Sequence, residues 1–363
     1  MAGFEFTPAF GNRPSQLVGR EPLISTLLGG LDSRPGSKER AIVMLGQRGY
    51  GKTVMLLELA ERAKERGFVV ASPTSVREGL VERVVEKLQD DGVEELGNRR
   101  VRLSGGSVGA LGFSVSLQFS DDEKDKSAEY KLTKICRELT RQKLGTLILI
   151  DELQGNSSEI RRLVGTYQEL VGEKLDVAMV LAGLPSSISG TLNDRVLTFL
   201  NRARKVTLGP LETGDIDAFY RKAFRASGVE IPQELRRRAA AATCGSPYLM
   251  QLVGHYLVAY ADGGKVDEAL FEEAMQSAQR EYENDICEAT LSGLSPTDRK
   301  YLRAMAELGG TCRTSEVAKR MGVSADYGQR YRRRLLDAGA IEAPSSGTVR
   351  FTIPYLKSYL LRD

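Results

Sequence analysis

The chain has 363 residues, which is enough for two or three domains with a sizeable core. Its content of 41% hydrophobic and 27% charged residues is ordinary for a globular protein, and its formal net charge is +3. No run reaches the roughly 18 apolar residues that a membrane span needs, and residues 1–10 lack the basic start and apolar core of a signal peptide. We therefore expect a cytoplasmic protein with no membrane contact.

The cysteines and the single histidine exclude two further kinds of site. The four cysteines are far apart, without a C-x-x-C pair, and predict buried thiols in a reducing compartment: Cys136, Cys244, Cys287 and Cys312. His255 falls in an apolar helical stretch and is interpreted as structural. Neither a zinc site nor a serine-histidine-aspartate triad is expected.

Strand and helix patterns alternate from the N-terminus to about residue 210. Apolar runs predict strands at 41–45, 68–72, 146–150, 177–183 and 206–210, and helical patterns separate the first four of them. Such alternation predicts an α/β core for residues 1–210, with a parallel sheet and helices on both faces, and the segment GQRGYGKT after its first strand makes this a P-loop NTPase core. Alternating residues punctuated by glycine predict a β-hairpin inserted at about 100–120.

The segment GQRGYGKT, residues 46–53, stands where the first strand gives way to a helix. It fits the pattern G-x-x-x-x-G-K-[ST], whose glycines let backbone N–H groups turn towards a phosphate at the helix N-terminus. Lys52 is expected to reach the β- and γ-phosphates of ATP, and the Thr53 hydroxyl to bind Mg²⁺. The predicted nucleotide contacts are Gly46, Gln47, Arg48, Gly49, Tyr50, Gly51, Lys52, Thr53 and Val54.

A second motif, TLILIDELQ at residues 146–154, places two acids after a buried strand. Ligands of open α/β sheets bind at the carboxyl ends of the strands. Asp151 is therefore expected to hold Mg²⁺, and Glu152 to polarise a water molecule against the γ-phosphate. Two adjacent acids could merely cap the next helix, but together with the first motif they favour hydrolysis of ATP to ADP.

Beyond residue 210 the strand patterns stop. Residues 211–290 show only helical patterns and predict a helical lid domain. At Ser295-Pro296 a new helix start begins a third segment, residues 291–363. From Thr290 to Asp363 there are 13 Lys or Arg against 7 Asp or Glu, a local charge of +6 that favours a polyanionic partner.

The third segment has the helix-turn-helix spacing and terminal hairpin of a winged helix. We expect it to bind double-stranded DNA. The candidate contacts are Gln329, Arg330, Arg332, Arg333 and, on the wing, Arg350. The alternative interpretations are a solvated arginine-rich face and a winged helix that docks a protein.

The motifs together resemble those of the AAA+ ATPases of the Orc1/Cdc6-like branch and of the neighbouring STAND signalling ATPases. The resemblance covers about residues 15–290. It is carried by VGRE at 18–21, by the two motifs above, by VLAGLP at 180–185 and by CGSPYLMQLV at 244–253. In the initiator branch a winged helix commonly follows.

The resemblance implies further site residues. Val18, Gly19 and Arg20 would border the adenine, and Arg202 or Arg204 would be an arginine finger that reaches a neighbouring subunit in a nucleotide-dependent homo-oligomer. The lid carries Pro247 in a G-S-P sequence where the initiators have a sensor arginine. The fourth strand ends in Ala182-Gly183 without the polar sensor residue of many AAA+ proteins, with Ser186 as the nearest hydroxyl. Both departures imply slow turnover.

Three functions follow. The first is an ATP-hydrolysing molecular switch associated with DNA. The second is a STAND-like signalling or adaptor ATPase whose winged helix docks protein. The third, a P-loop transferase, is disfavoured by Glu152 and by the helical lid.

Overall fold

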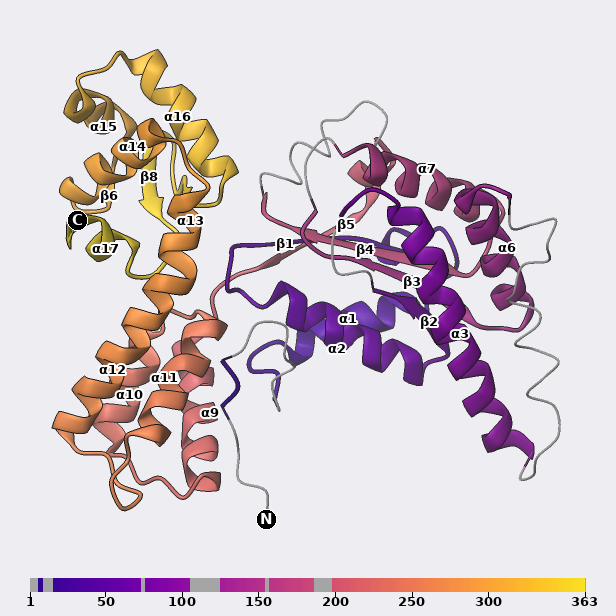
Figure 1. Cartoon of the computed structure of the whole chain (residues 1–363), viewed down its shortest axis with the longest axis horizontal. Coiled ribbons are helices and arrows are strands. Elements are labelled where there is room, and N and C mark those ends of the chain that lie inside the picture. Colours follow the sequence, from indigo (N-terminus) through magenta and orange to yellow (C-terminus); the bar gives the residue numbers. More distant parts are fainter. Residues whose placement is uncertain are drawn as a thin grey trace.

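The computed structural model describes residues 6–8, 16–72, 76–104, 125–153, 157–185 and 198–362, with only the backbone described in 93–104. An α/β core is followed by a set of helices and then by a small antiparallel sheet with its own helices (Figure 1). No helix in these ranges is long and apolar enough to cross a bilayer.

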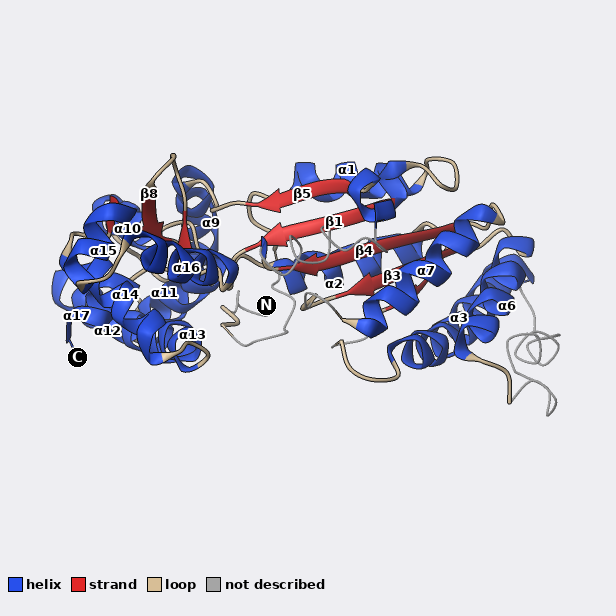
Figure 2. Ribbon diagram, turned by 90° about the horizontal axis from the view of Figure 1, so that it is seen from above, coloured by secondary structure: helices blue, strands red, loops and turns tan. Residues whose placement is uncertain are grey.

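Five parallel strands form the sheet of the core. They are β1 (Ala41–Gly46), β2 (Phe68–Ala71), β3 (Gly145–Ile150), β4 (Val177–Gly183) and β5 (Arg204–Leu208). Their order is β2-β3-β4-β1-β5, so β4 lies between the strand before the GQRGYGKT segment and the strand before Asp151 (Figure 2). All five strands therefore end on the side where the two motifs begin.

Both faces of the sheet are covered by helices. On one face lie α1 (Glu21–Leu31) and α2 (Lys52–Glu65), and on the other lie α3 (Leu80–Ser104), α6 (Ala128–Arg141) and α7 (Ser158–Gly172). Side chains along a strand alternate between faces, which explains the continuous apolar runs: in β4, Met179 packs under α7 while Val180 packs under α2. The predicted α/β fold with a parallel sheet is confirmed. Short 3₁₀ turns η1 (Lys38–Arg40) and η2 (Thr198–Arg202) precede β1 and β5.

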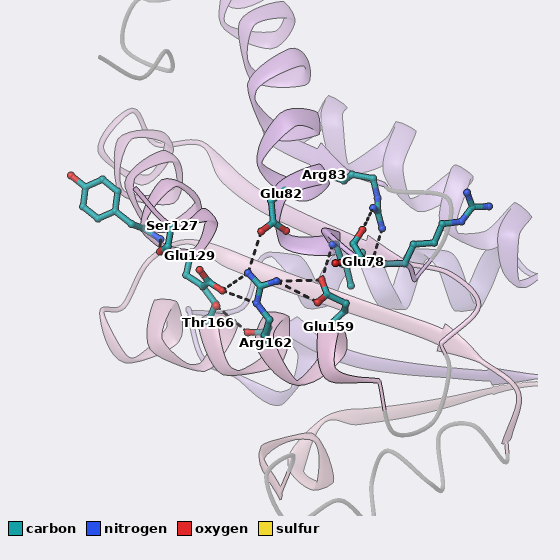
Figure 3. Close-up of polar contacts among 11 residues, drawn as sticks. Glu78, Glu82, Arg83, Ser127, Glu129, Glu159, Arg162 and Thr166 are labelled. Carbon is teal, nitrogen blue, oxygen red and sulfur yellow. Dashed lines mark hydrogen bonds and ion pairs between the residues drawn. The ribbon is translucent and has the colours of Figure 1, made fainter. Parts of the chain in front are cut away.

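The three helices on the second face are joined by a group of ion pairs around Arg162 of α7 (Figure 3). Its guanidinium Nη2 lies 2.7 Å from Glu129 of α6 and 3.2 Å from Glu82 of α3, and Nη1 lies 3.3 Å from Glu159. Glu159 Oε2 also accepts a hydrogen bond of 2.9 Å from the N–H of Leu80. The network fixes the start of α3 against α6 and α7.

The predicted β-hairpin at 100–120 is wrong in its first residues. Helix α3 continues to Ser104, so residues 100–104 are helical and not extended. The segment NRRVRLS alternates over only a few residues, and Leu103 also continues the helical spacing of Val93 and Leu96, at intervals of three and seven residues. The remainder of the predicted hairpin, 105–120, lies outside the described residues.

The helical segment after the core contains α9 (Thr213–Ala226), α10 (Gln233–Ala242), α11 (Pro247–Ala259), α12 (Glu268–Tyr282) and α13 (Ala289–Ser292). A π-helical turn, Glu283–Glu288, joins α12 to α13. Phe6 of the N-terminal arm packs among the rings of Phe219, Tyr220 and Phe224, at centroid distances of 5.7 to 6.2 Å. The first residues of the chain thus help to build the core of this segment.

One cysteine does not match its prediction. Cys136, Cys287 and Cys312 are buried free thiols, but Cys244 is exposed. The chain turns sharply between α10 and α11, and Cys244 there has a left-handed backbone (φ 48°) that directs its side chain outwards.

The last segment contains α14 (Pro296–Glu307), β6 (Thr311–Arg313), α15 (Thr314–Met321), α16 (Ala325–Asp337), β7 (Ile341–Glu342), β8 (Thr348–Phe351) and α17 (Leu356–Arg362). The strands pair antiparallel in the order β6-β8-β7. Helices α14 to α16 and the hairpin β7–β8 match elements that the sequence predicts, whereas β6 and α17 are not predicted. The assignment of this segment as a separate domain, like the boundary at 290, stays a prediction; we call residues 291–362 the C-terminal module.

Candidate functional site

The loop between β1 and α2 has the backbone needed to enclose an anion. Gly49 and Gly51 have positive φ angles of 75° and 81°, and Gly51 is the N-cap of α2. Left-handed conformations cost other residues about 1–2 kcal/mol, which is why glycine stands at both turns. The free N–H groups of the first turn of α2 therefore face the space beside the loop.

Lys52 closes over this loop. Its Nζ donates hydrogen bonds of 2.8 Å to the carbonyl of Gly46 and 2.9 Å to that of Gln47. Burial lowers the pKa of the Lys52 ammonium, a shift that Asp151 opposes and Arg48 increases. A phosphate placed among the loop N–H groups would give this ammonium the anion that it lacks.

Asp151 reaches Thr53 across β4. The Thr53 hydroxyl donates a hydrogen bond of 2.5 Å to Asp151 Oδ2, and the N–H of Glu152 donates one of 2.8 Å to Oδ1. Glu152 has a left-handed backbone (φ 53°) and an exposed side chain. The chain thus turns directly after β3, and the two neighbouring carboxylates take different positions at the mouth of the site.

The oxygen pair of Thr53 and Asp151 fits Mg²⁺. Magnesium prefers oxygen ligands and commonly takes few of them from protein, with phosphates and water completing its shell. The described residues contain no cluster of three or more acidic, histidine or cysteine side chains that would form an all-protein site. Any metal here would therefore depend on the bound phosphates for its remaining ligands.

A cavity of about 620 Å³ lies between the core and the helical segment. From the core it is lined by Arg48, Gly49, Tyr50, Gly51, Lys52, Thr53, Val54, Asp151 and Glu152. Across the cavity lies the N-terminus of α11, which begins at Pro247. Pro247 is close to the loop: a Cβ added to Gly51 would lie 3.8 Å from the Cγ of Pro247. The motifs of the core and the G-S-P sequence of the lid thus meet around one space, large enough for a nucleotide.

The N-terminal side of the cavity is formed by Val18 and Arg20. Val18 is buried, and Arg20 donates a hydrogen bond to the carbonyl of Gly209, which holds its guanidinium against the wall. Burial lowers the pKa of Arg20. Gly19 has a positive φ of 64° and lies close to Asp215 of α9. Gly19, Gly46 and Gln47 support this wall and the loop without lining the cavity.

Several cavity residues were missed by the sequence analysis. Thr7 of the N-terminal arm lines the cavity, and its N–H donates a hydrogen bond of 3.2 Å to Gln251 of α11. Asp285, in the π-helical turn, lines it as well and accepts a hydrogen bond from the Tyr248 hydroxyl. π-turns often occur at functional sites, but no local sequence signal distinguishes this one from a regular helix.

The C-terminal module contacts the same loop. Gly339, two residues after α16, lies so near Gln47 that a Cβ at 339 would displace the flexible end of the Gln47 side chain, and this Cβ would lie 3.6 Å from Leu184, directly after β4. The pKa of Tyr50 is raised by burial and further by Glu342 of the module, while Arg350 opposes the rise. Figure 1 shows the module beside the ends of β1 and β5.

The two predicted finger arginines lie away from this cavity. Arg202 is exposed at the end of η2, and Arg204 pairs in register with Ile42, near the amino ends of the strands. The phosphate loop follows the carboxyl end of β1, so neither arginine reaches the site of its own chain. A role towards a neighbouring subunit stays a prediction.

The candidate DNA contacts separate into two groups. Gln329, Arg330 and Arg333 are exposed on α16. Arg332 is half-buried, with an unpartnered Nε in the interior, because Tyr331 and Leu335 turn this side of α16 inwards. Arg350 forms an ion pair with Glu342 on the adjacent strand, towards Tyr50. Of the five candidates, only Gln329, Arg330 and Arg333 are exposed without an ion pair to another described residue.

Comparisons with known proteins identify the family of the α/β core. The family described as AAA ATPase domain matches residues 16–205, more than half of the chain, and the family described as Domain of unknown function (DUF8462) matches residues 284–360. No curated protein matches the chain.

The fold of the whole chain also occurs in solved structures. It is similar to the Walker-type ATPase PABY2304 of Pyrococcus abyssi, with a TM-score of 0.73 and 18% identity over 99% of both chains. It is similar, too, to the ORC2 protein of Aeropyrum pernix in its ADPNP–ADP complexes, with a TM-score of 0.63 and 15% identity over 98% of this chain and 95% of that chain. At these identities the likeness shows a shared fold.

Proposed function

Residues 16–205 make this chain a member of the AAA ATPase domain family, as the motifs predicted, and from that membership we propose that it is an ATP-hydrolysing molecular switch. The observation that carries the proposal is the meeting of Lys52, Thr53, Asp151 and Glu152 at one cavity, with Thr53 Oγ1 2.5 Å from Asp151 Oδ2. ATP or ADP would bind there with Mg²⁺.

Each side chain has a chemical role in this proposal. The loop N–H groups and Lys52 hold the triphosphate, and Thr53 and Asp151 hold Mg²⁺, which supplies charge neutralisation when bound. Glu152 orients a water molecule and accepts its proton as the water oxygen attacks the γ-phosphorus and the bond to the β–γ bridging oxygen breaks. Among the described residues, no lid arginine and no polar residue at the end of β4 lines the cavity, which favours slow turnover.

Substitution of Glu152 tests the hydrolytic step. We expect Glu152→Gln to lower the rate of ADP production about 100- to 1,000-fold, the usual contribution of a general base, while magnesium-dependent ATP binding by calorimetry stays near the wild-type level. Glu169→Gln, an exposed change on α7, is the matched control. Unchanged ADP production by Glu152→Gln would remove Glu152 from the mechanism, and wild-type protein that binds neither ATP nor ADP would contradict the nucleotide site itself.

The switch is supported by the contact between the C-terminal module and the phosphate loop. A ligand that moves Gln47 or Tyr50 changes the surface on which the module rests, so ATP and ADP would favour different positions of the module. We expect small-angle scattering of the whole chain to differ between the ADP complex and the ADPNP complex. Identical curves would contradict the switch.

Gly339 offers a direct test of this contact. Gly339→Val adds a side chain that would displace Gln47 from the module, and we expect the difference between the two nucleotide complexes to disappear. Gly347→Val is the matched control: Gly347 has a similar left-handed backbone (φ 75° against 67°) in the same module, but a Cβ there meets nothing within 4 Å. Both variants carry about 1–2 kcal/mol of backbone strain, so only their contacts differ.

Double-stranded DNA is the proposed partner of the exposed face of α16. Arg330 and Arg333 project from this helix without ion pairs to other described residues, and residues 290–363 carry a net charge of +6 while the rest of the chain carries −3. In whole-chain binding assays, replacing both by alanine should lower the slope of log affinity against log salt by about 2, one for each lost phosphate contact. Arg320→Ala, whose arginine is paired with Glu307 at 2.6 Å, is the control.

The alternative is a STAND-like adaptor ATPase whose C-terminal module docks a protein. The contact of Pro247 and Ser246 with the phosphate loop, in place of a lid arginine, favours it. Absence of DNA binding at low salt, together with a nucleotide-dependent movement of the module, would select this alternative. Light scattering with ATP and with ADP tests the proposed homo-oligomer, to which Arg202 or Arg204 would contribute the finger.

A further inference from the structure

Three cations line the cavity within the described part of the chain: Arg20, Arg48 and Lys52. Lys52 donates to two carbonyls of the loop, and Arg20 donates to the carbonyl of Gly209. Arg48 is exposed and makes neither a hydrogen bond nor an ion pair with any residue that the structure describes. It is therefore the cation in the cavity wall that the protein itself leaves available.

The place of Arg48 in the loop determines which part of a nucleotide it faces. The ammonium of Lys52 lies against the carbonyls of residues 46 and 47, and Arg48 is the next residue of the chain. The two cations are near enough for the charge of Arg48 to lower the pKa of Lys52. Lys52 is expected to reach the outer phosphates, so we expect the guanidinium of its neighbour in the loop to face the γ-phosphate end, whereas Arg20 lies on the wall formed with Val18.

The other elements around the cavity supply no competing cation. The helical segment contributes Pro247, Tyr248, Met250, Gln251 and Asp285, and the end of β4 contributes Gly183 and Leu184. None of these is positively charged, and Asp285 is an acid. A γ-phosphate, which adds negative charge that ADP lacks, would therefore find one free guanidinium at its end of the site.

From this arrangement we propose that Arg48 binds the γ-phosphate and is the residue by which the site distinguishes ATP from ADP. This inference rests on the proposed nucleotide site. Its planar guanidinium can donate two parallel hydrogen bonds to phosphate oxygens, and it has no phosphate to contact in the ADP complex. The resulting difference in affinity is what a nucleotide switch needs, because a ligand shifts an equilibrium only by its differential binding.

The test compares the affinities of whole-chain protein for ADPNP and for ADP, both with Mg²⁺, by calorimetry. Arg48→Ala should bind ADPNP about 10- to 100-fold more weakly than wild type, the loss expected for charge-assisted hydrogen bonds, and ADP within about twofold. Arg48→Lys, which keeps the charge but not the paired donors, should fall between. Arg34→Ala, an exposed arginine in the turn after α1 and outside the cavity, is the matched control and should change neither affinity.

Two results would overturn the inference: an unchanged ADPNP affinity in Arg48→Ala, or an equal loss for ADPNP and ADP. Retained ADP binding shows that the variant is folded. If Arg48→Ala is unstable, Arg48→Lys gives a second measurement of the ratio between the affinities for ADPNP and for ADP. Wild-type protein that binds neither nucleotide would instead contradict the proposed function, so the two failures are distinguishable.

Discussion

Arg162 and Arg48 belong to two regions that use charge in opposite ways. Around Arg162, the carboxylates of Glu82, Glu129 and Glu159 lie within 3.3 Å of one guanidinium (Figure 3). Around the phosphate loop, Lys52 turns to carbonyls and Arg48 has no ion pair among the described residues. The first region has satisfied its charges within the chain and joins helices, whereas the second leaves its charges available to a ligand.

The backbone conformations of these two regions differ as well. Glu82, Glu129 and Arg162 stand on regular helices with ordinary φ angles. At the cavity, Gly49, Gly51 and Glu152 all have positive φ, and a left-handed non-glycine residue is held there at a cost of about 1–2 kcal/mol. At this cavity, strained backbone and a charge without an ion pair occur together, as is common where a chain binds another molecule.

The largest effect that would sharpen this contrast is expected for Lys52→Ala. The variant removes a buried ammonium that would contact two phosphates, and we expect about a 100-fold loss of ATP affinity by calorimetry. Without nucleotide its free energy of unfolding should stay within about 1 kcal/mol of the wild-type value, because Lys52 bonds only to carbonyls. A large loss of stability with unchanged ATP affinity would reverse the roles given to the two regions.

A smaller and opposite effect is expected for Arg162→Ala. Its three ion pairs are partly exposed, so their combined contribution to the free energy of unfolding should be about 1–2 kcal/mol, measured by urea denaturation. ATP affinity should not change. Arg34→Ala, which removes an exposed arginine outside both regions, is the control. An Arg162→Ala variant with full stability but weakened ATP binding would contradict the structural role given to Arg162.

The smallest effect concerns pH. The pKa of Glu129 lies below its ordinary value of 4.5, owing first to a hydrogen bond with its own backbone and then to Arg162. A lowered carboxyl pKa stabilises the fold above the ordinary value, and this contribution is lost as pH falls through the lowered one. The difference in stability between wild type and Arg162→Ala should therefore be constant near neutral pH and shrink below about pH 4.5. A difference that grows in acid would contradict this ion-pair account.

Much of the core could be predicted because its signals are local. The five strands were predicted from continuous apolar runs, and the structure shows why: alternate residues of one strand pack on opposite faces. The motif residues from Gly46 to Thr53, with Asp151 and Glu152, were placed together because parallel strands end at one edge. The segment after Arg100 was misjudged because short alternation is ambiguous between a strand and the end of an amphipathic helix.

The sequence by itself thus determined the sheet, the phosphate loop and its two acids, since each depends on residues adjacent in the chain or on the rule that strands in a parallel sheet share an edge. Only the tertiary structure decided that Phe6 packs in the helical segment, that Asp285 reaches the cavity, that Arg332 turns inwards and that Gly339 rests on Gln47. Each of these contacts joins residues far apart in the chain. Their partners are selected by how whole helices pack, which no local pattern of residue types encodes.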